Sequence, residues 1–169
     1  AYAAWDVTEG SSDVIIAVID TGIQTNHPDL DGKLVPGYNF VRDNGDGNDD
    51  NGHGTHVAGT AAAETDNSSG GAGFCPNCRL MPVKVLNSGG SGSLANVARG
   101  IIYAADNGAD IINLSLGGSS STTLKNAIDY AWSKGVFVIC AAGNDGASVI
   151  YYPAGYDNCF SVAATNQAD

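Results

Sequence analysis

Short apolar runs alternate with amphipathic stretches along the chain. Runs rich in Val, Ile, Leu and Ala predict five β-strands, at residues 13–19, 80–86, 110–115, 135–141 and 159–164. The first run is almost continuously β-branched, which is typical of a central strand buried on both faces of a sheet. Three further stretches predict helices, at residues 53–64, 94–106 and 122–133. The first of these is rich in alanine, and the other two repeat apolar residues at i, i+3 and i+4 spacing.

The order of these elements predicts the fold class. Strands that alternate with helices form a mostly parallel sheet, because each right-handed crossover places its helix on one face of the sheet. We therefore expect an α/β fold in three layers, with helices on both faces of a mostly parallel sheet. The sequence contains no internal repeat and no break in composition, so residues 1–169 are expected to form a single domain. A dinucleotide site is not expected, because no Gly-x-Gly-x-x-Gly follows the first strand.

Charge and composition narrow the class of protein. The chain has a formal net charge of −11, from 18 acidic and seven basic side chains. Neither nucleic acid nor an anionic membrane is therefore expected as a partner. No apolar run approaches the roughly 20 residues of a membrane-spanning helix, and we expect that no signal peptide remains. Few lysines and arginines with abundant Gly, Ser, Thr and Asn are typical of secreted hydrolases, so we expect a secreted protein.

Two residues that can act together in catalysis lie at the ends of predicted elements. Asp20 follows the first apolar run, directly before a Thr-Gly turn, and His53 begins the alanine-rich helix. The working cleft of an open α/β sheet lies beyond the carboxyl ends of its strands. There Asp20 can accept a hydrogen bond from an imidazole N–H and fix the tautomer of the ring. The alternatives are that Asp20 is a turn residue and that His53 is a structural histidine.

A second histidine in the same helix suggests a metal site instead. His53 and His56 are three residues apart and share a helix face. A catalytic zinc helix needs histidines four residues apart and a glutamate beside the first, and this helix has neither. We therefore do not expect zinc.

Four segments, in this order, resemble the subtilisin-like serine endopeptidases. They are AVIDTG at 17–22, NGHGTHVAGT at 51–60, IINLSLGG at 111–118 and VICAAGN at 138–144. Four ordered motifs are far more specific than any one of them. The likeness covers nearly the whole chain and is greatest to the thermitase-like, calcium-dependent branch of the family. It implies a subtilisin-like fold and hydrolysis of peptide bonds by an Asp-His-Ser triad.

The resemblance implies a role for individual residues. Asp20 becomes the aspartate of the triad, His53 the general base, and His56 a packed residue of the helix. Asn144 becomes a side-chain donor to the oxyanion, and loss of such a donor costs about 3–4 kcal/mol of transition-state stabilisation. The sequence around Asn144 is also that of an ordinary turn, which is the alternative.

The resemblance also implies where a polypeptide substrate or inhibitor binds. Two segments match the extended edges between which the family holds a peptide as an added strand. Ala141, Ala142 and Gly143 match the far wall of the pocket for the residue before the cleaved bond. Such small residues suggest a roomy pocket that tolerates large apolar or aromatic side chains. The implied binding residues are Gly90, Ser91, Gly92, Ser115, Leu116, Gly117, Ala142 and Gly143. For the first edge, a merely flexible loop is the alternative.

The serine nucleophile of the family has no counterpart in these residues. The family carries it in a Gly-Thr-Ser-Met-Ala-Ser-Pro segment, whereas Gly-Thr occurs here only at 54–55 and 59–60, with no serine after it. We therefore expect the amino-terminal part of a longer enzyme, with a sheet that is incomplete at its carboxyl end. The serine would lie on a complementary carboxyl-terminal segment. A non-catalytic calcium-binding domain or an inert proteolytic fragment is the alternative.

One loop resembles a calcium site of the family. Calcium requires six to eight oxygen ligands. The resemblance implies side-chain ligands from Asp29 and Asn67, and carbonyl ligands from Glu64, Ser69 and Gly71. Relatives add an aspartate from an amino-terminal segment that precedes residue 1 of this chain. A polar loop without an ion is the alternative.

A second, strongly acidic loop lies at residues 43–50. Four carboxylates within eight residues repel one another, and the glycines between them permit the turns of a cation cage. The thermitase-like branch holds a calcium in this loop, so the candidate ligands are Asp43, Asp46 and Asp49. The ligand positions do not match one for one, because Asn39 and Arg42 stand where acidic residues are expected. A solvated acidic loop is the alternative.

The four cysteines are an even number, which is compatible with an oxidising compartment. Cys75 and Cys78 lie in a turn, where a local disulfide is favoured. A redox or metal Cys-x-x-Cys needs a helix start or a second such pair, and the sequence has neither. Cys140 and Cys159 lie in predicted apolar strands and are expected to be buried free thiols.

Overall fold

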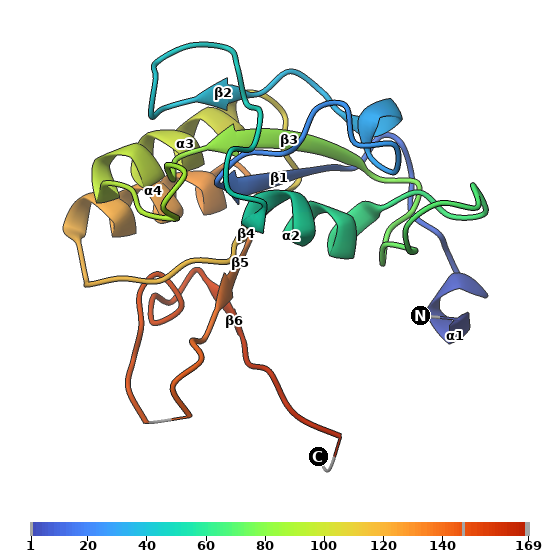
Figure 1. Ribbon diagram of the computed structural model, residues 1–169. Helices are drawn as coiled ribbons and strands as arrows, with labels where there is room; N and C mark the ends of the chain where they lie inside the picture. The colour runs from blue at the N-terminus through green and yellow to red at the C-terminus, as the bar shows by residue number, and fades with distance from the viewer. Residues whose placement is uncertain (1, 147, 168–169) are drawn as a thin grey trace.

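A six-stranded parallel sheet forms the centre of the computed structural model, which describes residues 2–146 and 148–167 (Figure 1). The strands follow the order β2-β3-β1-β4-β5-β6, and every paired strand is parallel to its neighbour. Their bounds are β1 Ile15–Asp20, β2 Tyr38–Asn39, β3 Arg79–Lys84, β4 Ile111–Leu114, β5 Phe137–Ala141 and β6 Phe160–Val162. All carboxyl ends of the strands therefore meet at one edge of the sheet.

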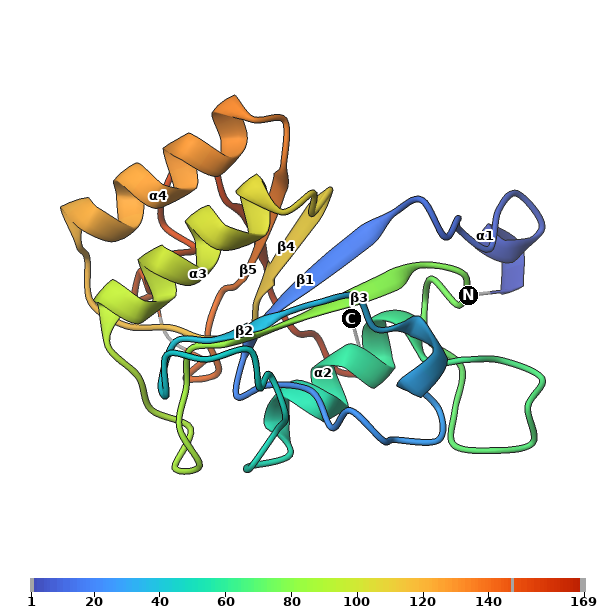
Figure 2. The same cartoon turned by 90° about the horizontal axis from the view of Figure 1, so that it is seen from above.

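Helices cover both faces of the sheet (Figures 1 and 2). α2 (His53–Ala62) lies on one face, and α3 (Leu94–Asp106) and α4 (Thr122–Ser133) lie side by side on the other. Two short elements, α1 (Tyr2–Trp5) and the 3-10 helix η1 (Asp31–Lys33), complete the described structure. None of the described helices is long and apolar enough to span a membrane. The chain thus has the three-layer α/β fold that the sequence predicts.

Strand β1 shows why the core has two parts. Successive side chains of a strand point to opposite faces of the sheet. Ile16 and Val18 pack with α2, whereas Ala17 and Ile19 pack with α3 and α4, and all four are buried. The continuous apolar run of β1 is therefore required by its central position.

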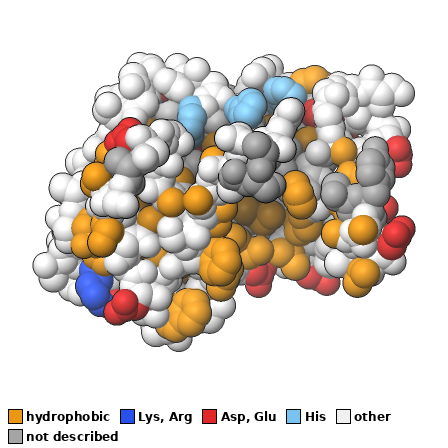
Figure 3. Space-filling view, turned by 90° about the horizontal axis from the view of Figure 1, so that it is seen from below, with side chains coloured by type: hydrophobic (Ala, Val, Ile, Leu, Met, Phe, Trp, Pro, Cys, Tyr) orange, Lys and Arg blue, Asp and Glu red, His pale blue; other side chains and the backbone are white. Residues whose placement is uncertain are grey.

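The carboxyl-terminal part of the sheet is covered on one face only. Val138 and Cys140 of β5 are buried in the core beneath α3 and α4. The opposite face carries Phe137, Phe160 and Val162, which are 40%, 59% and 46% exposed. Among the described residues, α2 is the helix on this face, and it lies against β1 and β3. Hydrophobic side chains are accordingly visible on the surface seen from below (Figure 3).

The predicted elements agree closely with the structure. The helices at 94–106 and 122–133 have the predicted bounds, and α2 ends two residues before the predicted end at 64. All five predicted strands are present, with each end within two residues of its prediction. β2 and α1 have no counterpart among the predicted elements, because two strand residues and four helical residues are too few to show a period.

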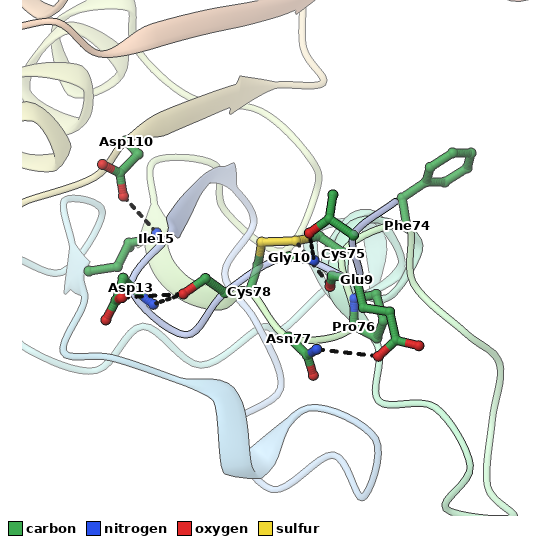
Figure 4. Close-up of a disulfide and its surroundings, with 12 residues drawn as sticks. Glu9, Gly10, Asp13, Ile15, Phe74, Cys75, Pro76, Asn77, Cys78 and Asp110 are labelled. Carbon is green, nitrogen blue, oxygen red and sulfur yellow. Dashed lines mark hydrogen bonds between the residues drawn. A yellow bond between two sulfur atoms is a disulfide. The ribbon is translucent and has the colours of Figure 1, made fainter. Parts of the chain in front are cut away.

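A disulfide joins Cys75 to Cys78 in the turn before β3 (Figure 4). This turn packs against the amino-terminal segment. The Asn77 N–H donates to the Glu9 carbonyl oxygen at 3.2 Å. A Cβ added to Gly10 would overlap the Cys75 sulfur, so only glycine fits there. The bridged turn therefore holds the segment before β1 against the end of the loop before β3.

Cys140 and Cys159 are both free. Cys140 is buried, as expected, whereas Cys159 is only partly buried. The difference arises because Cys159 precedes β6, the edge strand of the sheet.

Candidate active site

Asp20 and His53 form a hydrogen-bonded pair at the carboxyl end of β1. Asp20 is the last residue of β1 and is fully buried, while His53 begins α2 and leaves 51% of its side chain exposed. His53 Nδ1 lies 2.8 and 2.9 Å from the two carboxylate oxygens. Because a carboxylate only accepts hydrogen bonds, Nδ1 carries a proton, and in the neutral imidazole Nε2 then has the lone pair of a base. The structure thus brings together the two residues that the sequence pairs, with one imidazole nitrogen free to act as a base.

Close backbone contact joins the strand to the helix at this point. The Gly54 N–H donates to Thr21 Oγ1 at 2.9 Å. A Cβ added to Gly54 would overlap the carbonyl oxygen of Gly22. Gly22 itself has a φ of +106°, which side chains other than that of glycine rarely adopt. The two glycines therefore let the helix approach closely enough for Asp20 to reach His53.

Side chains satisfy the free N–H groups of the first turn of α2. The His53 N–H donates to Asn51 Oδ1 at 3.1 Å, and the Thr55 N–H and hydroxyl donate to Asp49 Oδ2 at 3.0 and 2.6 Å. The other oxygen of Asp49 accepts the N–H groups of Asn51 and Gly52 at 2.9 and 3.0 Å. Burial alone would raise the pKa of Asp49, but these donors outweigh burial and hold the pKa well below its usual range. Asp49 therefore anchors the helix that carries His53.

A buried lysine joins the same junction to the acidic loop. Lys84 is 1% exposed, and its ammonium donates to the carbonyl oxygens of Thr21 and Leu86 at 2.6 and 2.9 Å. It also forms an ion pair with Asp50 at 2.6 Å. Lys84 is a residue of the site that was not predicted from the sequence. The available signal is a lysine inside the apolar run 80–86, because a buried ammonium needs several acceptors.

A cleft of 380 Å³ beside His53 contains both implied substrate edges. Its lining includes Gly90, Ser91 and Gly92 from the first edge and Ser115, Leu116 and Gly117 from the second. A Cβ added to Gly92 would overlap the carbonyl oxygen of Val85, so the first edge lies directly on the chain that follows β3. The structure therefore brings His53 and both edges to one cleft.

A second hollow, of 230 Å³, borders the same edge at residues 115–117. Gly143 and the exposed Asn144 line it from the opposite side, at the end of β5. Ala142 is partly buried and donates its N–H to the Val162 carbonyl oxygen at 2.9 Å, so it supports this wall from behind. Residues 115–117 border both hollows, which places Asn144 next to the cleft that holds His53.

Comparison with known proteins agrees with this geometry. A model described as the subtilase family matches residues 11–169 of the chain. The chain belongs to the subtilase family. It is 56% identical over 167 residues to a thermophilic serine proteinase of Bacillus sp. (strain AK1), covering 98% of this chain and 42% of the relative. It is 52% identical over 170 residues to thermitase of Thermoactinomyces vulgaris, covering 100% of this chain and 61% of thermitase.

A solved structure supports the same fold. Sphericase superposes with a TM-score of 0.86 at 40% sequence identity, covering 92% of this chain and 54% of Sphericase. The chain thus spans about half the length of the subtilases that it matches. The resemblance to the thermitase-like branch is therefore confirmed.

The first loop expected to bind calcium in this subtilase is drawn together around Asp29. Asp29 is buried, and its two carboxylate oxygens accept Asn67 Nδ2 at 2.7 Å and the Gly71 N–H at 3.2 Å. The Glu64 N–H donates to the Asp29 carbonyl oxygen at 3.1 Å, and the Ser69 N–H donates to Asn67 Oδ1 at 3.1 Å. One carboxylate, one amide and three carbonyls are oxygen donors of the kind that calcium takes, so these residues fit the ion by type.

In the second loop, the candidate carboxylates accept donors of this chain. Asp43 pairs with Arg99 at 2.8 Å, and Asp46 accepts the Asn48 N–H at 3.1 Å. Both oxygens of Asp49 are filled by the donors at the start of α2. Among the described residues, no group of three or more His, Cys, Asp or Glu side chains is placed to hold a metal ion. Donors of this chain therefore order the acidic loop, and calcium at this loop stays a prediction.

His56 differs from its expected role as a packed residue. It lies one turn after His53 on α2 and is exposed. It borders a cavity of 690 Å³ that also includes Asp29. His56 therefore lies on the same helix as the base and borders a different cavity.

Proposed function

We propose that this chain is the part of a secreted, calcium-dependent serine endopeptidase that carries the catalytic base and its orienting acid. The observation that supports this most is the hydrogen bond of 2.8 Å between the buried Asp20 carboxylate and His53 Nδ1. A buried acid, a half-exposed imidazole and a free Nε2 are what a serine hydroxyl needs in order to lose its proton.

The chemistry follows from the charges at the pair. His53 Nε2 takes the proton of the serine hydroxyl as the oxygen attacks the substrate carbonyl carbon, and the imidazole becomes positively charged. Asp20 stabilises that charge through the proton on Nδ1. His53 then delivers the proton to the leaving amine, and water releases the acyl group in a second round of the same transfers. The Asn144 side-chain amide donates a hydrogen bond to the oxyanion in both rounds.

We assign the two edges of the cleft to a polypeptide substrate. Residues 90–92 and 115–117 line one cleft with His53, and an extended peptide between them would add a strand by main-chain hydrogen bonds. Gly90 and Gly117 leave room for a close approach, since the nearest atom to a Cβ added at either position would be 3.8 Å away. The residue before the cleaved bond would then face the hollow beside Asn144.

We assign the serine to a complementary carboxyl-terminal segment outside these residues. The support is the uncovered sheet face that carries Phe137, Phe160 and Val162. Exposed apolar surface of this kind marks an interaction site. A helix packed there would cover this face beside α2 and complete the layer of helices on that side of the sheet.

Calcium at the Asp29 loop would stabilise the enzyme. The five residues already lie together, and an ion would turn the Asn67 amide so that its oxygen faces the metal. Binding to the folded form alone adds about 2.7 kcal/mol at a hundredfold excess over Kd. Thermal unfolding with calcium and with a chelator tests this, and coinciding melting curves would exclude the site.

The function is tested by supplying the missing segment. Two proteins are expressed: the 169-residue chain alone, and the same chain fused at its carboxyl end to the carboxyl-terminal part of thermitase. Peptide hydrolysis and labelling by a serine-directed phosphonate are measured for both. We expect both only in the longer protein, with the label on the added part. In subtilisin, loss of the serine or the histidine costs about 2 × 10⁶ in kcat, and we take over that measured scale for His53→Ala.

His56→Ala is the matched control, because His56 lies on the same helix and is exposed. It should retain activity. A longer protein that folds but neither cleaves peptides nor reacts with the phosphonate would favour the alternative, a non-catalytic calcium-binding domain. Labelling of a serine within residues 1–169 would mean that the nucleophile has been assigned to the wrong segment.

A further inference from the structure

Tyr151 occupies the hollow beside Asn144. From the sequence, the small residues of the wall suggest a roomy pocket. In the structure, this hollow of 230 Å³ lies between Gly117 on one edge and Gly143 on the other, and Tyr151 lines it with them. The free volume is thus what remains after a tyrosine ring has entered the space between the two edges.

The ring reaches from one edge to the other. A Cβ added to Gly143 would lie 2.7 Å from Cδ2 and 3.1 Å from Cε2 of Tyr151. A Cβ added to Gly117 would lie 3.8 Å from Cβ and 3.9 Å from Cδ1 of the same tyrosine. Gly143, which has a φ of +113°, therefore makes room for the ring because it has no side chain.

Both ends of Tyr151 are held in place. Its hydroxyl donates to the Asp145 carboxylate. This hydrogen bond, together with the negative charge of Asp145, raises the pKa of Tyr151. At the backbone, the next residue is bridged to the second edge. The Gly118 N–H donates to the Tyr152 carbonyl oxygen at 2.8 Å, and the Tyr152 N–H donates back to Gly118 at 3.2 Å. A bulky side chain that entered the hollow would have to displace the ring and break its bond to Asp145.

We propose that Tyr151 determines the specificity of this protease for the residue before the cleaved bond, by filling the pocket so that it accepts short side chains such as alanine. This inference rests on the proposed function, because it assigns the hollow to that residue of the substrate.

The test uses this chain followed by the serine-bearing part of thermitase. Hydrolysis of two chromogenic peptides, succinyl-Ala-Ala-Pro-Ala-p-nitroanilide and succinyl-Ala-Ala-Pro-Phe-p-nitroanilide, gives the ratio of their kcat/KM values. The unsubstituted protein should prefer the alanine peptide. Tyr151→Gly should raise the Phe-to-Ala ratio of kcat/KM about 10- to 100-fold, which is the discrimination that differences in side-chain size typically give in an apolar pocket. Tyr151→Ala should raise it in the same direction, and it serves if the glycine variant does not fold.

Tyr151→Phe is the matched control. It keeps the ring and removes the bond to Asp145, so it should retain most of the preference for alanine. A parent protein that prefers the phenylalanine peptide, or a Tyr151→Gly ratio within twofold of the parent, would overturn the inference while leaving the proposed function intact. A folded parent that cleaves neither peptide would contradict the proposed function and the inference together.

Discussion

Replacement of Lys84 by methionine tests how the Asp20–His53 junction is held. Methionine keeps the apolar stem of the side chain but removes the ammonium, which makes three hydrogen bonds of 2.6 to 2.9 Å. The carbonyl oxygens of Thr21 and Leu86 then lose a buried donor, and each such loss costs about 1–3 kcal/mol. Asp50 loses a cationic partner, but its side chain is 35% exposed and keeps Arg42 at 3.8 Å. The lost ion pair therefore contributes less to the destabilisation than the two carbonyl oxygens do. We expect Lys84→Met to lower the free energy of unfolding by about 3–4 kcal/mol, as for other broken buried ion pairs.

Urea unfolding, followed by tryptophan fluorescence, measures this change. With an m-value of about 2 kcal/mol/M, the midpoint should fall by about 1.5–2 M. Lys125→Met is the matched control. Lys125 is 45% exposed and pairs with Asp129 at 2.7 Å within one turn of α4, so its loss should leave the midpoint unchanged. A Lys84→Met midpoint within about 0.5 M of the parent, at the m-value above, would refute the reasoning that the ammonium is structurally required.

Three further predictions concern the helix junction, the acidic loop and a thiol. Gly54→Ala should destabilise the protein by about 1–3 kcal/mol, because its Cβ overlaps backbone, whereas Gly59→Ala on the same helix meets nothing within 4 Å and should stabilise it by up to about 1 kcal/mol. Equal shifts in thermal melts would contradict the close contact. Because the folded-state pKa of Asp49 is lowered, its ionised form contributes stability above the unfolded pKa of about 3.9, and this contribution is lost as pH falls through the folded pKa. The difference in free energy of unfolding between the parent and Asp49→Asn should therefore become smaller in acid. A difference that grows in acid would contradict this prediction. A hydrogen bond with Cys159, together with burial, raises the pKa of Cys140, so Cys140 should resist maleimide at pH 8 until urea unfolds the chain. Mass spectrometry of the labelled peptides decides this, and rapid labelling of Cys140 in the native protein would count against it.

The elements with a clear period could be predicted from the sequence. α3 and α4 place apolar residues at helical spacing, and β1 is a continuous apolar run, so each specifies its own bounds to within two residues. Asp20 and His53 could be paired because each lies where an apolar element meets a glycine turn. The local pattern alone left a turn residue and a structural histidine as alternatives, and the resemblance to the subtilases assigned the pair its catalytic role.

The parts that could not be predicted depend on partners that are distant in the sequence. For the acidic loop, the sequence left calcium and a solvated loop as alternatives, because its carboxylates are adjacent in sequence and repel one another. In the structure, Lys84 and Arg99 supply positive charge from 34 and 56 residues away. Likewise, the small wall at Gly143 suggests an open pocket, whereas Tyr151 fills it from a later turn. Sequence shows which charges and gaps exist, but only the fold determines which side chains meet them.

The parallel sheet also sets the order in which this protein can assemble. β1 is the first strand along the chain, but its two neighbours, β3 and β4, begin 64 and 96 residues after it, at Arg79 and Ile111. Every pairing in the described sheet is parallel, so none forms through a local hairpin, and each must close a long loop before it gains any contact. During synthesis β1 therefore stays unpaired until much of the chain has emerged, with its apolar run open to association with other chains. Slow synthesis at low temperature should favour recovery of the folded protein, because it lengthens the time for these distant pairings relative to the rate at which nascent chains encounter one another.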